Sequence, residues 1–317
     1  MRVAAIDCGT NSLRLLVADA DPRARTLADV DRRMEIVRLG QGVDATGRLA
    51  EDALARTLQA LTGYAGIVAA AGAAAVRMVA TSATRDAANA ADFVAGVRSV
   101  LGIAPEVLSG EEEARLSFLG ATLELAAGPG RAQPPYLVAD IGGGSTEFVL
   151  GDPARVTAAV SVDIGCVRMT ERHLRGDPPA PAEVAAARAD IGAALDVVAA
   201  KIPVAGARTL VGLAGSVTTV AALALGLDGY DAARIHHSRI GAGQVREQTA
   251  RLLAMPQADR AQLAVMHPGR VDVIGGGALV LTAIMDRFGF GEVLVSEHDI
   301  LDGIAWTLAA GGADGHG

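Results

Sequence analysis

A short segment near the N-terminus of the chain is repeated in its middle. Small apolar residues lead to Asp7 and the turn Cys8–Ser12, and similar residues later lead to Asp140 and the turn Ile141–Ser145. Four pairs of identical residues are each 133 positions apart: Asp7 and Asp140, Gly9 and Gly142, Ser12 and Ser145, Asp19 and Asp152. An apolar run follows each turn, so both segments predict strand–turn–strand hairpins. The repeat therefore predicts two related halves.

Length and composition agree with two halves of a globular α/β protein. At roughly 150 residues per domain, 317 residues favour two domains. With 51% apolar and 20% charged residues, the disordered, collagen-like and disulfide-scaffold classes are excluded. Aromatic residues are only 3% of the chain, so its core must be made of small side chains packed densely as helices on sheets.

Charge and cysteine content limit the partners that we expect. The net charge is −8 and no run of Lys or Arg supplies a basic face, which argues against nucleic acid as a partner. Cys8 and Cys166 lack metal-binding spacing and suit a reduced, cytoplasmic protein. The N-terminus does not resemble an export signal, and the uncharged run Thr209–Leu227 contains central Gly, Ser and Thr residues. We therefore expect a cytoplasmic protein with no membrane partner.

The chemistry of the repeated turn suits a phosphate. Glycine lets backbone N–H groups approach a ligand without an intervening Cβ, and Ser and Thr hydroxyls add further donors. An Asp at the end of the preceding strand can hold a hydrated Mg²⁺. A single copy is more simply explained as an ordinary hairpin whose Asp and Gly serve the turn. Two matched copies favour a cleft with two phosphate clamps and two metal-facing carboxylates.

Two further glycine segments follow apolar runs. The pattern of Leu210–Thr219 and of Val271–Gly277 predicts a strand, a glycine turn and a helix N-terminus, which suits an anion or the edge of a nucleotide. Close packing of helix on strand explains the same glycines equally well. His236 and His237, expected in a strand, would point to opposite faces, so no role is assigned to them.

An acidic helix start supplies a candidate base. Ser109 and Glu112 fit a capping box, and Glu111 and Arg115 fit an exposed i,i+4 pair. Glu113 has no such structural role. A carboxylate there, near a metal–phosphate cleft, could orient or deprotonate an attacking water molecule.

Two arginines end segments that are rich in hydroxyl groups. Arg85 follows Thr81–Thr84, and Arg168 follows Ser161–Val167. Each could clamp a polyphosphate chain, and each could equally pair on the surface with a neighbouring acid such as Asp86.

Taken together, these motifs resemble the exopolyphosphatase/guanosine pentaphosphate phosphatase (Ppx/GppA) family of the actin–Hsp70–sugar-kinase superfamily. The pair of repeated turns is the specific part of this resemblance, which covers nearly the whole chain. The stretches that carry it are Asp7–Ser12, Val37–Gly40, Ala80–Arg85, Ser109–Arg115, Asp140–Glu147, Gly165–Glu171, Gly215–Thr219, His236, Val273–Ala278 and Val295–Ser296.

The resemblance implies an α/β fold with two ribonuclease-H-like (actin-like ATPase) domains and an interdomain cleft. We expect the first domain at residues 1–128 and the second at 135–299, with a helix at about 300–312 packing back onto the first. The Gly- and Pro-rich stretch Ala126–Pro135 is the expected crossing. Longer members carry an additional C-terminal helical region, so the chain resembles the short two-domain subgroup. Their long-chain processivity and dimer architecture therefore do not carry over, and a homodimer stays an open alternative.

The resemblance also implies Mg²⁺-dependent hydrolysis of the terminal phosphate of inorganic polyphosphate, or of the 5′-phosphate of pppGpp. By motif, Glu113 and Glu147 are the catalytic acids, with the choice of base left open. Asp7 and Asp140 face the metal. The phosphate-binding residues are Thr10, Asn11, Ser12, Arg85, Gly142, Gly143, Gly144, Ser145 and Thr146. A kinase of the same fold and a catalytically weak protein that binds pppGpp or polyphosphate remain alternatives.

Overall fold

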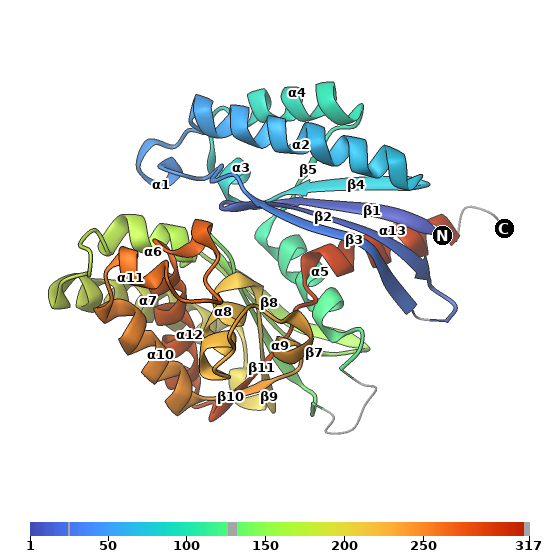
Figure 1. The fold of residues 1–317 in the computed structure, drawn as a ribbon. Helices are drawn as coiled ribbons and strands as arrows, with labels where there is room; N and C mark the ends of the chain where they lie inside the picture. Colours follow the sequence, from blue (N-terminus) through green and yellow to red (C-terminus); the bar gives the residue numbers. More distant parts are fainter. Residues whose placement is uncertain (25, 126–131, 314–317) are drawn as a thin grey trace. The chain divides into compact units, whose positions relative to one another are not determined.

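The computed structural model describes residues 1–24, 26–125 and 132–313. The chain divides into two compact units, which Figure 1 shows in sequence colours. Unit 1 comprises Met1–Gly120 and Asp299–Gly317, and unit 2 comprises Ala121–His298. Of the crossing expected at Ala126–Pro135, residues 126–131 lie outside the described residues.

Unit 1 contains a five-stranded sheet in the order β3-β2-β1-β4-β5. The first three strands are antiparallel, and β4 and β5 run parallel to β1. The strands are β1 (Arg2–Cys8), β2 (Ser12–Asp21), β3 (Thr26–Ile36), β4 (Ala75–Ala80) and β5 (Glu106–Val107). This arrangement of three antiparallel and two parallel strands is ribonuclease-H-like.

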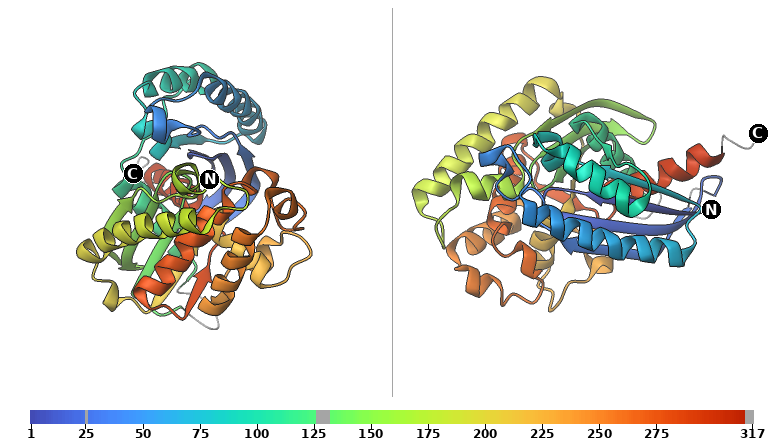
Figure 2. Two further views of the ribbon diagram at one scale, coloured as in Figure 1. Left: turned by 90° about the vertical axis from the view of Figure 1, so that its left-hand side faces the viewer. Right: turned by 90° about the horizontal axis from the view of Figure 1, so that it is seen from above.

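Alternation along the strands of unit 1 gives each face of the sheet its own core. In β1, Ala4 and Ile6 belong to the core under two helices, α2 (Glu51–Ala71) and α4 (Ala90–Leu101). These helices lie side by side in Figures 1 and 2. Val3 and Ala5 belong to the opposite core, with α13 (Ile300–Ala313) and α5 (Gly110–Thr122). The two short helices of the unit are α1 (Val43–Thr46) and α3 (Ser82–Asp86).

Helices α5 and α13 come into close contact at two glycine residues, Gly120 and Gly303. A Cβ atom on Gly303 would lie 2.1 Å from the carbonyl oxygen of Leu116, and one on Gly120 would lie 1.8 Å from that of Asp299. Both neighbours are backbone atoms, which cannot rotate away as a side chain can. Glycine is therefore needed at both positions for the C-terminal helix to reach its place on the sheet.

Unit 2 repeats the strand arrangement of unit 1 and adds one edge strand. Its six-stranded sheet has the order β10-β11-β9-β6-β7-β8, with β6, β7 and β8 antiparallel and β9 parallel to β6. The strands are β6 (Tyr136–Ile141), β7 (Thr146–Asp152), β8 (Arg155–Val162), β9 (Thr209–Leu213), β10 (Arg239–Gly241) and β11 (Glu292–Val295). The β1–β2 and β6–β7 hairpins confirm the predicted repeat.

One face of this second sheet carries a single large core. Leu137 and Ala139 of β6 pack there with residues of α7 and α12. The helices of unit 2 are α6 (Cys166–His173), α7 (Pro181–Lys201), α8 (Ala214–Ala224), α9 (Ala232–Ile235), α10 (Ala242–Ala254), α11 (Gln257–Arg260) and α12 (Ile274–Phe288). Among the described residues, none of the helices has the length and apolar character needed to cross a membrane.

The prediction of a strand at residues 271–274 is wrong. A 3-10 turn, Pro268–Arg270, leads instead into α12, whose first turns contain the three glycines. A Cβ on Gly276 would lie 2.7 Å from the carbonyl oxygen of Cys166, and one on Gly277 would lie 2.1 Å from Ser216 Oγ. These glycines therefore serve the close approach of α12 to α6 and α8. The strand expected within Leu210–Thr219 is confirmed as β9, but α8 begins at Ala214, so the residues Gly215–Thr219 that were expected to form a glycine turn are helical.

The glycine contact between α5 and α13 gives a stability prediction. Gly303→Ala should destabilise the protein by about 1 to 3 kcal/mol, because the new methyl group overlaps the backbone of α5. Gly311→Ala is the matched control in the same helix, because nothing lies within 4 Å of a Cβ there. Thermal unfolding of both variants checks this. An unchanged melting temperature for Gly303→Ala would show that the two helices can separate at no cost.

Candidate functional site

The turn between β1 and β2 is fixed through its carbonyl groups. The carbonyl of Thr10 accepts from the N–H of Gly40 (2.8 Å), and that of Asn11 accepts from Val37 (3.1 Å) and Arg38 (2.9 Å). These donors follow β3, the third strand of the sheet. A Cβ on Gly40 would lie 2.3 Å from Cγ2 of Thr10, so the segment can come this close only with glycine there.

The turn between β6 and β7 is held in the same way. The carbonyl of Gly142 accepts from Cys166 (2.9 Å), and that of Gly143 accepts from the N–H of Val167 (2.9 Å). The carbonyl of Gly144 accepts from Gly165 (3.1 Å). The donors again follow the third strand, and they form the start of α6. A Cβ on Gly165 would lie 2.2 Å from the Gly143 oxygen, so glycine is required here too.

These contacts determine where the amides of both turns point. In a trans peptide the N–H lies on the side opposite the preceding carbonyl. When the carbonyls of Thr10 and Asn11 face residues 37–40, the N–H groups of Asn11 and Ser12 face the other way. The N–H groups of the second turn, from Gly143 to Ser145, likewise point away from α6. Each hairpin therefore presents a row of amide donors, which suits an anion.

Two of the predicted phosphate-binding hydroxyls already have protein partners. Thr10 Oγ1 lies 2.8 Å from the hydroxyl of Ser82, and both side chains are buried. Thr146 Oγ1 donates to the carbonyl of Ile164 at 3.0 Å. The Thr10 contact ties the first turn to the start of α3, and the Thr146 contact holds the loop that leads to α6.

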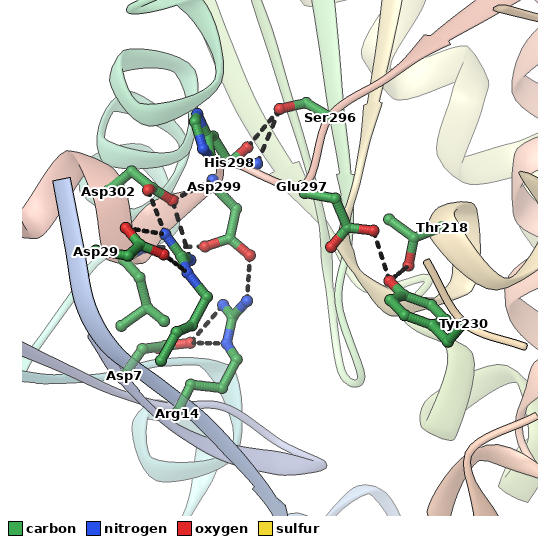
Figure 3. Close-up of polar contacts among 12 residues, drawn as sticks. Asp7, Arg14, Asp29, Thr218, Tyr230, Ser296, Glu297, His298, Asp299 and Asp302 are labelled. Carbon is green, nitrogen blue, oxygen red and sulfur yellow. Dashed lines mark hydrogen bonds and ion pairs between the residues drawn. The ribbon is translucent and has the colours of Figure 1, made fainter. Parts of the chain in front are cut away.

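Asp7 is a buried carboxylate bound by one arginine. Arg14 donates from Nε (3.0 Å) and Nη2 (2.6 Å) to Asp7 Oδ2, and its Nη1 donates to Asp299 (Figure 3). Asp7 Oδ1 is buried and has no hydrogen-bond partner among the residues described. Burial raises the pKa of Asp7, and the guanidinium of Arg14 opposes that shift. One oxygen of Asp7 is thus anchored while the other remains as an acceptor.

In unit 2, Asp140 and Glu147 stand directly opposite each other on β6 and β7. Both are buried, at 7% and 2% exposure. Glu147 Oε1 accepts from the hydroxyl of Ser161 at 2.7 Å, which fixes the orientation of its carboxylate. Two carboxylates placed opposite each other on adjacent strands could hold a cation. Carboxylate oxygens are the ligands that Mg²⁺ prefers.

Glu113 and Arg85 are in direct contact in unit 1. Arg85 Nη1 donates to Glu113 Oε2 at 3.2 Å and to the carbonyl of Leu108 at 3.0 Å. The surface pairing with Asp86 that the sequence left open is therefore replaced by a pairing with the candidate base. Glu113 is 8% exposed. The arginine holds this carboxylate in one place at the start of α5.

The acids next to Glu113 have the structural roles predicted for them. Glu112 Oε2 accepts from the N–H of Ser109 (2.9 Å), and its own N–H donates to Ser109 Oγ (3.3 Å). Hydrogen bonds from Ser109 lower the pKa of Glu112. Glu111 pairs with Arg115 on the surface at 2.8 Å. These contacts confirm the capping box and the i,i+4 pair.

Arg168 supports the second turn. Its Nε donates to the carbonyl of Gly144 at 2.8 Å, and its Nη2 lies 3.8 Å from Asp163 Oδ1. The arginine thus adds a side-chain donor to the backbone donors at the start of α6.

The histidines do not lie as expected. His236 and His237 follow α9 rather than occupying a strand, and their rings stack at 3.7 Å. Glu124, His236 and His298 bring one ligand atom each within 4.8 Å of the others. However, the N–H of Glu297 donates to His236 Nδ1 at 3.1 Å. A neutral ring that accepts at Nδ1 carries its proton on Nε2, so this ring orientation does not offer Nε2 to a metal.

The structure distributes the predicted site residues between the two units. Unit 1 holds Asp7, Thr10, Asn11, Ser12, Arg85 and Glu113, and unit 2 holds Asp140, Gly142, Gly143, Gly144, Ser145, Thr146 and Glu147. Within the units, it brings Arg85 to Glu113 and Asp140 to Glu147. Sequence reasoning missed Arg14, Ser82 and Ser161. Arg14 could have been identified from the repeat, because it lies 133 positions before Glu147.

Comparison with known proteins agrees with this geometry. The chain is 53% identical over 319 residues to Exopolyphosphatase 2 of Mycobacterium tuberculosis, covering 97% of this chain and 98% of that protein. It is 30% identical to a guanosine-5′-triphosphate,3′-diphosphate pyrophosphatase of Aeromonas salmonicida, covering 98% of this chain and 60% of that protein. A crystal structure of an exopolyphosphatase-like protein matches with a TM-score of 0.91 at 41% identity, covering 96% and 97% of the two chains.

The model of the Ppx/GppA phosphatase family matches residues 16–309. That range contains Glu113, the second hairpin turn and the Asp140–Glu147 pair. The match includes parts of both units, and the relatives above extend it to nearly the whole chain. The chain belongs to the Ppx/GppA phosphatase family.

Proposed function

We propose that the protein is an exopolyphosphatase that hydrolyses the terminal phosphate of inorganic polyphosphate in a Mg²⁺-dependent reaction. The observation that carries this proposal is the pair of hairpins whose turn amides point outward beside buried carboxylates. Amide rows bind phosphate oxygens, and the acids supply a base and metal ligands. The 53% identity to Exopolyphosphatase 2 of M. tuberculosis supports the same substrate.

Asp140 and Glu147 fit the metal. They are buried, they face each other across adjacent strands, and both offer carboxylate oxygens. A bound Mg²⁺ would supply a positive charge that stabilises the phosphoryl group during transfer. Ser161 holds Glu147 in the orientation that this role needs.

Glu113 is the base in this proposal. A water oxygen attacks the terminal phosphorus, the bond to the bridging oxygen breaks, and the water proton passes to the Glu113 carboxylate. The shortened polyphosphate leaves with the electron pair of the broken bond. Arg85 fixes Glu113 through a contact of 3.2 Å and is itself anchored to the carbonyl of Leu108. Glu147 is the alternative base, and substitution of Glu113 separates the two.

Hydrolysis of the 5′-phosphate of pppGpp is the second candidate. It is favoured by the likeness to the Aeromonas salmonicida protein, whose name describes a guanosine-5′-triphosphate,3′-diphosphate pyrophosphatase. Both substrates end in a phosphoanhydride, so the same turns and acids serve either one. A kinase is disfavoured because Glu113, paired with Arg85, suits activation of water. A weakly catalytic binding protein is disfavoured by the full set of buried acids.

Phosphate release from long polyphosphate, short polyphosphate and pppGpp, assayed in parallel with Mg²⁺, should show the highest kcat/KM for a polyphosphate. Chelation of the metal should abolish release, because the acid pair of unit 2 then lacks its cation. A higher kcat/KM for pppGpp would assign the alternative. Transfer from ATP to an acceptor without net release would assign a kinase, and tight binding without turnover would assign a sensor.

Glu113→Gln should lower kcat by about 10² to 10⁴-fold, because the amide cannot take the proton of the attacking water. Glu111→Gln is the matched control on the same helix, since Glu111 pairs with Arg115 at the surface. Its activity should be that of the wild type. Equal melting temperatures would show that both variants are folded. Turnover near the wild-type rate in Glu113→Gln would move the role of base to Glu147.

Gly165→Ala should lower phosphate release by roughly 100-fold, because displacing a substrate-positioning group by about 1 Å has that effect. The added methyl group would lie 2.2 Å from the Gly143 carbonyl and would push the second turn out of place. Gly192→Ala, in the open on α7, is the control and should keep full activity. Wild-type kinetics in a folded Gly165→Ala would mean that the turn does not position the substrate.

A further inference from the structure

The segment that returns the chain from unit 2 to unit 1 is held in part by side chains that can gain or lose a proton. This returning segment comprises residues 296–298, the end of unit 2. The N–H of Ser296 continues the bonding of β11 to β9 and donates to the carbonyl of Gly212 at 3.0 Å. The next N–H, that of Glu297, donates instead to Nδ1 of His236 at 3.1 Å. A histidine side chain thus replaces the sheet as the acceptor for the returning segment.

The direction of this hydrogen bond determines the state of the His236 ring. A backbone N–H can only donate, so Nδ1 must present its lone pair, and the ring must be neutral with its proton on Nε2. A protonated ring carries a hydrogen on both nitrogens and has no acceptor. Protonation of His236 would therefore place two N–H groups against each other and break the bond to Glu297.

Two further histidines form a cluster with His236. The ring of His237 stacks on that of His236 with centroids 3.7 Å apart, and the ring of His298 lies at 4.5 Å. His237 has a φ of 60°, which is rare for a residue with a Cβ atom, and its N–H donates to the carbonyl of Val295 at 2.7 Å. Burial lowers the pKa of His237, Glu124 opposes this shift, and His298 adds to it. The ring stacked on His236 is therefore neutral near neutral pH.

Acidic groups face the histidine cluster from two segments. Glu124, which follows α5, places Oε2 3.7 Å from His236 Nε2 and 3.7 Å from His298 Nδ1. The carboxylate of Glu297 accepts from the hydroxyl of Tyr230 at 2.6 Å (Figure 3). Glu124 favours a charged His236 ring, whereas the N–H of Glu297 favours a neutral one. The charge of this ring and its bond to the returning segment therefore exclude each other.

We propose that His236 is a pH-sensitive latch on the returning segment. Near neutral pH the neutral ring accepts from the N–H of Glu297 and holds the segment against the histidine cluster. In acid the ring takes up a proton at Nδ1, the hydrogen bond breaks, and the segment is released. Because the latched state requires the neutral ring, its contribution to stability is present above the ordinary titration range of histidine and is lost as the pH falls below about 6.5.

Amide hydrogen exchange of the full chain tests the latch, with Ser296 as an internal reference. Both N–H groups lie in the returning segment, but only that of Glu297 is bound by a histidine. From about pH 7.5 to about pH 5.5, the protection factor of Glu297 should fall by about 10-fold relative to that of Ser296, the effect of losing one hydrogen bond. ¹⁵N NMR of the rings should show the proton of His236 on Nε2 at the higher pH, and protons on both nitrogens at the lower pH.

His236→Asn keeps an acceptor and removes the titration. The amide oxygen of asparagine can accept from the N–H of Glu297, so the relative protection of this N–H should be the same at both pH values. His173→Asn is the matched control, because His173 lies 2.8 Å from Asp190 and takes no part in the histidine cluster. It should keep the wild-type response.

Glu124→Gln removes the charge that favours the protonated ring, so it should move the release of Glu297 to lower pH by about half a unit. A proton on Nδ1 of His236 at about pH 7.5, unchanged relative protection of Glu297 in acid, or the wild-type response in a folded His236→Asn would each overturn the proposal. Loss of the response in His173→Asn, or release at higher pH in Glu124→Gln, would also contradict it. If His236→Asn does not fold, the wild-type ring spectra and exchange rates still decide. None of these measurements uses phosphate release, so the proposed activity is tested separately.

Discussion

The position of each phosphate-sized turn depends on a neighbouring backbone segment that donates hydrogen bonds to the carbonyl groups of the turn. Carbonyl groups of both turns are bound by amides that follow the third strand of the same sheet, at 37–40 in unit 1 and 165–168 in unit 2. A planar trans peptide transmits that constraint to the opposite side, so the turn amides are aimed without any side chain. Gly40 and Gly165 permit this approach and are therefore necessary to the turns. The carboxylates are placed by the strands that lead into and out of the turns.

Local patterns predicted much of this arrangement. The paired hairpins, the capping box at Ser109 and the α/β class follow from alternation, spacing and turn residues, which act over short distances along the chain. Contacts between distant segments could not be predicted in the same way. Arg14 meets Asp299, 285 residues later, and Arg85 meets Glu113, 28 residues later. The glycines at 275–277 were mistaken for a turn because glycine serves both sharp turns and close helix packing, and only the neighbours at α6 and α8 decide between them.

The two units keep apolar residues at equivalent core positions and differ in charge at one position next to the turn. Ala4, Ile6 and Cys8 of β1 and their counterparts Leu137, Ala139 and Ile141 of β6 all face a core formed with helices. Substitution among these apolar residues preserves the alternation on which the sheet depends. At the cross-strand position, by contrast, an arginine in one unit corresponds to a glutamate in the other. A duplicated hairpin can thus keep its turn geometry while one copy pairs an acid with an acid and the other pairs an acid with an arginine.

The arginines near the turns bear on how a chain of net charge −8 would hold a polyanion. Arg14 and Arg85 donate to Asp7 and Glu113, and Arg168 donates to the carbonyl of Gly144. Each guanidinium therefore orients a carboxylate or a turn. Under the proposed function, the aligned amides and the cation proposed for the acid pair of unit 2 supply attraction for the substrate. Amide donors act only at hydrogen-bond distance, whereas an ion acts over several ångströms, so the metal should govern capture and the amides should govern alignment.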